Sequence, residues 1–115
     1  MRIDPHAHTS HSDGTDSPTE LVRKAREVGL DVVGITDHDT FSGWEEAAAE
    51  AVRIGVGLVR GVEITCSADG ISVHLLGLLP RPDDGPLAAL LAANRSARPR
   101  RARTMVERLA ADFPI

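Results

Sequence analysis

Short apolar runs alternate with helix-forming segments along the chain, and this alternation restricts the fold more than any other feature of the sequence. The apolar runs lie at residues 2–4, 32–36, 58–65 and 71–78. The segments with helical spacing of apolar residues lie at 17–28, 42–53, 87–97 and 101–111. Strands that alternate with helices build α/β folds, so we expect an α/β protein with four strands.

Turn and cap residues predict where these elements begin and end. The segment Ser-Pro-Thr-Glu at 17–20 has the pattern of a capping box, and Gly29 marks the end of the first helix. Ser-Gly-Trp-Glu at 42–45 repeats the capping pattern, with Ser42 as the expected cap of a helix that stops near Gly55. Asp69-Gly70 predicts a turn between the last two strands, and Pro99 predicts a break between the last two helical segments.

The composition is ordinary for a soluble globular protein, and residues 1–94 are acidic. The sequence has 115 residues, 42% hydrophobic and 26% charged, with no apolar run near the roughly 20 residues of a membrane span. The N-terminus lacks the apolar region of a signal peptide, so we expect a cytoplasmic protein. Residues 1–94 carry 7 Lys or Arg against 15 Asp or Glu, whereas residues 95–115 carry 6 against 2. The single cysteine excludes an internal disulfide, so any metal must be held by His and carboxylate groups.

A His-x-His pair follows the first predicted strand, in the segment Asp-Pro-His-Ala-His at 4–8. Side chains two residues apart on an extended segment project to the same side, so His6 and His8 can bind one cation. Neutral imidazole suits Zn, Mn or Fe. Asp4 could fix the tautomer of a liganding histidine through a hydrogen bond to the ring nitrogen that does not bind the metal. Taken alone, the motif is equally compatible with two solvated histidines.

Residues of the same kind recur on the other predicted strands. Thr-Asp-His-Asp at 36–39 follows the second strand, Glu63 lies late in the third, and His74 lies within the fourth. The C-terminal ends of barrel strands collect functional groups, so residues distant in sequence are expected to meet there. His74 alternates with apolar residues and needs a partner if it is buried; a hydrogen-bonded core histidine is the alternative interpretation.

These motifs resemble the PHP family, named for polymerase and histidinol phosphatase. The resemblance is carried by residues 4–9 (DPHAHT), 12–14 (SDG), 35–39 (ITDHD), 61–63 (GVE) and 73–77 (VHLLG), in the family's order. It implies a barrel of about seven βα units, which needs roughly 200 residues. The chain would then hold an incomplete PHP-type (βα)7-like barrel, with its first three to four βα units at residues 1–80. Residues 81–115 would be the start of a helical insertion or cap.

The resemblance also implies a metal site with two to three divalent ions, Mn, Fe or Zn. The implied ligands are His6 and His8 on a first metal, Glu63 bridging the first and second, His74 on the second, and Asp13 and His38 on the third. Asp37 and Asp39 resemble carboxylates that hold metal ligands in place without binding the metal themselves. They could instead cap the following turn. His11 lies where the family varies; we expect a loop residue there, with its proximity to Asp13 making it a second candidate.

The activity implied by the resemblance is hydrolysis of phosphate esters by metal-activated water. The implied substrates are nucleotides or short oligonucleotides, with no membrane and no stable protein partner. Serines 10, 12 and 42 lack a Ser-His-Asp context, which disfavours covalent catalysis. Arginines in the basic C-terminal segment could clamp phosphates, or could form a solvated helix face. The candidates are Arg95, Arg98 and Arg103.

The sequence departs from the family pattern after His74, where the closing Asp-x-His motif of the family has no counterpart. We therefore expect a truncated chain that is inactive by itself and that exposes apolar strand faces. Two other functions remain open. One is a histidinol-phosphate-type phosphatase or an amidohydrolase-like hydrolase, and the other is a non-catalytic metal-binding fragment.

Overall fold

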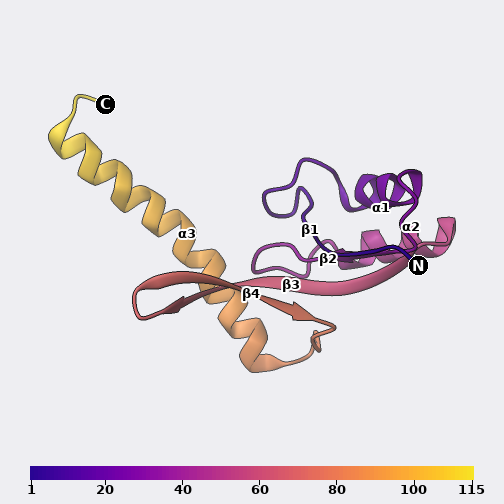
Figure 1. Ribbon diagram of the computed structural model, residues 1–115. Helices are drawn as coiled ribbons and strands as arrows, with labels where there is room; N and C mark the ends of the chain where they lie inside the picture. The colour runs from indigo at the N-terminus through magenta and orange to yellow at the C-terminus, as the bar shows by residue number, and fades with distance from the viewer. The chain divides into compact units, whose positions relative to one another are not determined.

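The computed structural model describes residues 1–115 and divides into two compact units, residues 1–82 and 83–115. The first unit contains β1 (Ile3–Ala7), α1 (Pro18–Glu27), β2 (Val32–Ile35), α2 (Trp44–Ile54), β3 (Gly57–Ala68) and β4 (Ile71–Leu78). The second unit contains one long helix, α3 (Gly85–Asp112). The predicted α/β fold is confirmed (Figure 1). No helix combines the length and the apolar character needed to cross a membrane.

The four strands form one curved sheet in the order β1-β2-β3-β4. The β1–β2 and β2–β3 pairs are parallel, and helices α1 and α2 make the two crossovers. The β3–β4 pair is antiparallel and is joined by the predicted turn at Asp69 and Gly70, both of which have positive φ angles. His74 therefore reaches the sheet on a strand that runs against the others, opposite Thr65, rather than at the end of a fourth parallel strand.

Helices α1 and α2 pack on each other and on β2 to form the core of the first unit. The buried residues of this core are Val22, Ala25, Val33, Ile35, Trp44, Ala47, Ala51 and Val56. Trp44 also stacks on Phe41, with 4.2 Å between ring centroids, and its Nε1 donates a 2.9 Å hydrogen bond to the Gly61 carbonyl oxygen. This core fixes α2 against β3, whose central residues contribute to the polar cluster described below.

An ion-pair network ties the two helices together at the edge of this core. The buried carboxylate of Glu50 accepts hydrogen bonds from Arg53 on α2, at 2.6 and 2.9 Å, and from Arg23 on α1 at 2.8 Å. These guanidinium groups, Arg53 first, lower the pKa of Glu50 to about 2. The carboxylate is therefore ionised across the physiological range.

Several predicted boundaries differ from the structure, among them the end of β3, which runs to Ala68 rather than to residue 65. Strand β1 begins at Ile3 and runs to Ala7, so it includes His6. Helix α2 has Gly43 at its N-cap position and no side-chain cap, and the Ser42 hydroxyl contacts His11 and Thr40 instead. Helix α3 continues through Pro99, although proline removes one backbone donor; the alanines and arginines around it are strong helix formers.

The predicted capping box of α1 is confirmed, with Ser17 accepting from the Glu20 backbone N–H and Glu20 accepting in return. The expected exposure of apolar strand residues is also found. On β4, Ile71, Leu75 and Leu78 are 67%, 56% and 49% exposed. This strand therefore presents apolar side chains to solvent in the described chain.

Candidate metal centre

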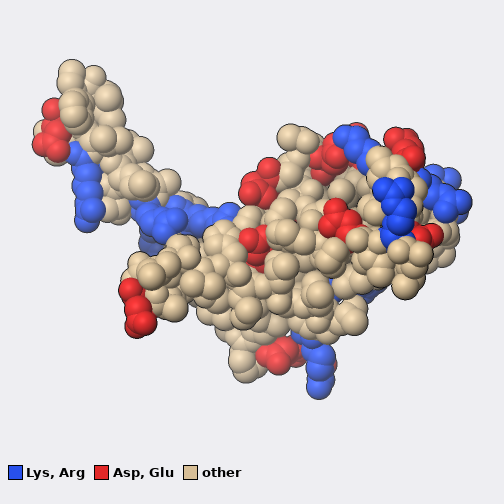
Figure 2. Space-filling model, in the orientation of Figure 1, with Lys and Arg blue, Asp and Glu red and all other residues tan.

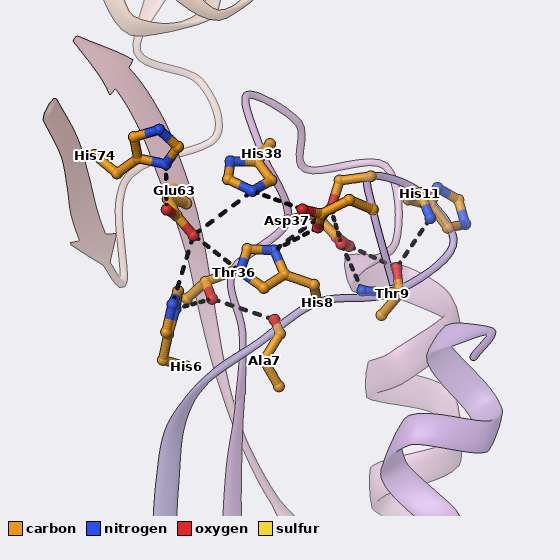
Figure 3. Close-up of polar contacts among 12 residues, drawn as sticks. His6, Ala7, His8, Thr9, His11, Thr36, Asp37, His38, Glu63 and His74 are labelled. Carbon is orange, nitrogen blue, oxygen red and sulfur yellow. Dashed lines mark hydrogen bonds and ion pairs between the residues drawn. The ribbon is translucent and has the colours of Figure 1, made fainter. Parts of the chain in front are cut away.

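The six residues predicted as metal ligands lie close together at one end of the sheet. Figure 3 labels five of them, His6, His8, His38, Glu63 and His74. The six form three groups, and in each group the possible ligand atoms lie within 4.8 Å of one another: His6, His8 and Glu63; His8, Asp13 and His38; and His38, Glu63 and His74. Strands β1, β3 and β4 and the segments after β1 and β2 each supply part of this cluster.

The carboxylate of Glu63 lies at the centre of the cluster (Figure 3). Its Oε2 atom is 2.9 Å from His8 Nε2, 3.6 Å from His6 Nε2 and 3.9 Å from His38 Nε2. Its Oε1 atom is 2.5 Å from His74 Nδ1. The two oxygens of one carboxylate therefore face different histidines, as a bridging ligand requires.

Two buried polar atoms in this cluster have no hydrogen-bond partner, Glu63 Oε2 and His38 Nδ1. A buried carboxylate oxygen without a partner is costly, so native structures almost always satisfy it. Three imidazole nitrogens are directed around Glu63 Oε2, and a divalent cation would complete its interactions. The imidazole and carboxylate donors suit Mn, Fe or Zn, so the residues present fit the implied ions.

Asp13 reaches the cluster from the loop after β1. Its carboxylate oxygens lie 3.2 Å from His38 Nε2 and 3.4 Å from His8 Nδ1. Partial burial by itself raises the pKa of Asp13, but the nearby His38 and His8 outweigh it and the net pKa is lowered. The loop turns tightly at Gly14, where an added Cβ would lie 2.4 Å from the His8 carbonyl oxygen. Glycine is therefore needed at Gly14 to bring Asp13 beside His8.

Asp37 and Asp39 are fully buried on either side of His38 and make matching contacts. Asp37 accepts hydrogen bonds from the backbone N–H and the hydroxyl of Thr9, both at 2.6 Å. Asp39 accepts from the backbone N–H and the hydroxyl of Thr65, at 2.9 and 2.6 Å. Each carboxylate thus ties the end of β2 to a neighbouring segment, the loop after β1 or strand β3. The supporting role expected for both residues stays a prediction.

The contact expected between Asp4 and a histidine ring is not made. The Asp4 carboxylate accepts from the backbone N–H of His6 at 3.1 Å, in the local pattern typical of aspartate. The ring Nδ1 of His6 lies 2.8 Å from the Thr36 hydroxyl instead. Thr36 is part of a recognised motif, but its position within that motif does not reveal which ring it contacts.

His11 and the arginines lie outside the three groups. The Nδ1 of His11 is 2.7 Å from the Ser42 hydroxyl, and His11 belongs to none of the groups. Arg95, Arg98 and Arg103 are exposed on α3, along which basic side chains gather in Figure 2. Their part in phosphate binding stays a prediction.

Comparison with known proteins identifies relatives of this chain. The PHP domain model matches residues 4–106. The chain is 39% identical over 101 residues to a 5′-3′ exoribonuclease of Haemophilus influenzae, covering 88% of this chain and 37% of that protein. It is 41% identical over 103 residues to a 3′,5′-nucleoside bisphosphate phosphatase of Chromobacterium violaceum, covering 90% of this chain and 36% of that protein. The chain therefore spans little more than a third of the length of these relatives.

Solved structures give the same result. A protein assigned as a metal-dependent phosphoesterase from Bifidobacterium adolescentis superposes with a TM-score of 0.90 at 45% identity, over the whole of this chain and 40% of that one. An amidohydrolase from Chromobacterium violaceum, solved with sulfate and no metal, superposes with a TM-score of 0.88 at 39% identity, over 97% of this chain and 39% of that one. The curled four-stranded sheet matches part of the fold of these proteins, and the chain belongs to the PHP domain family.

Proposed function

We propose that this chain supplies a large part of the metal centre of a cytoplasmic phosphoesterase that hydrolyses phosphate esters of nucleotides or short oligonucleotides. The observation that carries the proposal is the buried Glu63 carboxylate, whose Oε2 has no hydrogen-bond partner and lies 2.9–3.9 Å from three imidazole nitrogens. Relatives named nucleoside bisphosphate phosphatase and exoribonuclease support the substrate class.

The donor atoms of this chain suffice for two ions with three protein ligands each. A neutral imidazole offers one lone pair, so His8 and His38, which each belong to two groups, can serve only one ion at a time. Glu63 is the only carboxylate that belongs to two of the groups, and its two oxygens face different histidines. We therefore assign one ion to His6, His8 and Glu63, and a second to His38, Glu63 and His74. This assignment moves His38 to the second ion from the third, where the resemblance placed it with Asp13. Asp13 alone then remains for any third ion.

Divalent ions at such a site polarise a phosphoryl group and lower the pKa of water to about 7. The protein's own residues hold the ligands in place, through the Asp37–Thr9 and Asp39–Thr65 contacts on either side of His38.

Metal binding by this chain tests the centre, and His38→Ala is the informative variant. We expect the unchanged chain to bind Mn²⁺ or Zn²⁺ and His38→Ala to lose an ion, as measured by calorimetry and elemental analysis. His11→Ala is the matched control, since His11 lies in the adjoining loop but outside all three groups. Absence of metal binding by the unchanged, folded chain would overturn the proposed centre.

Activity is tested in a chimera that joins this chain to the remaining segment of the Chromobacterium violaceum phosphatase. We expect the chimera to hydrolyse a nucleoside 3′,5′-bisphosphate or a short RNA, and this chain alone to bind metal without turnover. Preference for histidinol phosphate or for an amide substrate would favour the alternative hydrolase functions. A chimera that is folded and metal-loaded but inert on all of these substrates would favour a non-catalytic metal-binding fragment.

A further inference from the structure

We propose that Thr36 sets the tautomer of His6, holding the ring proton on Nδ1 so that Nε2 presents a lone pair to the cluster. The tautomer of His6 is a property of the metal-free chain. The effect of Thr36 on metal affinity rests on the proposed metal centre. Thr36 is thereby a positioning residue that acts through His6.

The direction of the hydrogen bonds follows from the chemistry of the three groups involved. The Thr36 hydroxyl oxygen lies 3.2 Å from the Ala7 carbonyl oxygen and 2.8 Å from His6 Nδ1. A carbonyl oxygen can only accept, so the hydroxyl proton is directed at Ala7. The hydroxyl then has only lone pairs left for the imidazole, and His6 Nδ1 must be the donor. A neutral His6 with its proton on Nδ1 has a free lone pair on Nε2.

The other side of the ring is consistent with this assignment. His6 Nε2 lies 3.6 Å from Glu63 Oε2, which is too long for an N–H donor bonded to that oxygen. His8 differs, because its Nε2 is 2.9 Å from the same oxygen. The His6 ring is therefore held from the Thr36 side, and its Nε2 faces Glu63 across a space that a shared cation would span.

The fold fixes the orientation of the Thr36 hydroxyl. Thr36 is fully buried at the end of β2, and its backbone N–H donates to the Ala7 carbonyl oxygen at 2.8 Å. Its methyl group lies against Gly61, where an added Cβ would be only 2.9 Å from Thr36 Cγ2. With the backbone and the methyl group both placed, the branched side chain has one staggered orientation available. That orientation points Oγ1 at His6.

Two substitutions separate the hydroxyl from the shape of the side chain. Thr36→Val keeps the size and the branching but removes the hydroxyl, whereas Thr36→Ser keeps the hydroxyl and loses the methyl contact with Gly61. The first readout is the tautomer of His6 in the metal-free chain, read from two-bond ¹H–¹⁵N correlations of the imidazole near pH 8, where an ordinary imidazole is neutral. We expect the Nδ1–H form in the unchanged chain and in Thr36→Ser, and a mixture of tautomers in Thr36→Val.

The second readout is Mn²⁺ or Zn²⁺ affinity, measured by titration calorimetry. Loss of a partner behind a liganding histidine typically weakens metal binding by about 10- to 100-fold, which we expect for Thr36→Val but not for Thr36→Ser. Thermal unfolding without metal checks that both variants are folded.

The outcomes separate this inference from the proposed function. An Nε2–H tautomer in the unchanged chain overturns the inference even if metal binds, and so does an unaltered Nδ1–H tautomer in Thr36→Val. A chain that binds no metal, yet loses the Nδ1–H form on Thr36→Val, overturns the proposed function and leaves the tautomer assignment standing.

Discussion

Replacing Glu63 by Gln should remove the gain in stability that metal gives to the folded chain. Glu63 belongs to two of the three groups and is the residue assigned to both ions, so no other single substitution should cost as much metal binding. A ligand that binds only the folded state at 100 times its dissociation constant stabilises that state by about 2.7 kcal/mol. In a domain of this size 1 kcal/mol shifts Tm by about 4–8 °C, so each bound ion should raise the Tm of the unchanged chain by about 10–20 °C.

The amide of Gln keeps the size of the side chain but carries no charge to bind a cation among the histidines. We expect Glu63→Gln to unfold within a few degrees of the unchanged chain without metal, and to gain little when Mn²⁺ or Zn²⁺ is added. Glu27→Gln is the matched control, since Glu27 is exposed on α1 and belongs to none of the groups. Thermal unfolding followed by circular dichroism gives the comparison. A Glu63→Gln chain that is stabilised by metal as much as Glu27→Gln would refute the central role of this carboxylate.

Further substitutions test the remaining assignments. Asp13→Asn should leave the number of bound ions at two by elemental analysis, because Asp13 belongs to neither assigned ion; a drop to one would show that the assignment is wrong. Trp44→Phe removes the hydrogen bond to Gly61 and should cost about 1 kcal/mol in urea unfolding, and an unchanged midpoint would contradict this. Ser17→Ala should cost about 1 kcal/mol by the same assay, through loss of the helix cap. The Glu50 pKa is lowered from 4.5 to about 2, so its contribution is complete above pH 4.5 and is lost as pH falls towards 2. Glu50→Gln should therefore lose less stability than the unchanged chain between pH 5 and 3.

Periodicity in the sequence was sufficient to predict the fold class, whereas the set of six candidate ligands came from the resemblance to the PHP family. Parallel strands with short crossovers place their C-terminal ends at one edge, which brings His6, His8 and His38 together. The approach of His74 on an antiparallel strand needed only the turn at Asp69 and Gly70. These features depend on periodicity and turn chemistry, which are local properties of the sequence.

The hydrogen-bond partners of the residues around the ligands could not be predicted, because they depend on the register of neighbouring strands and on the path of the loops between them. A capping box at residues 42–45 requires a free Ser42 hydroxyl, and that hydroxyl is engaged by Thr40 and by His11 from the loop after β1. The sequence pattern also allowed Asp37 and Asp39 to cap their own turn, whereas both cross to threonines on other segments. Local patterns identify polar residues without identifying their distant partners.

The close approach of β1 and β2 brings Thr36 beside His6. The register of the two strands shifts between Asp4 and Ala7, which places an irregularity in this part of β1. Pro5 lies so near β2 that a Cβ added at Gly34 would be 2.3 Å from its carbonyl oxygen. Only glycine permits this approach, which allows the Thr36 hydroxyl to reach both Ala7 and the His6 ring. The arrangement of His6 and His8 therefore depends on Gly34 in β2, which has no side chain to contact either imidazole.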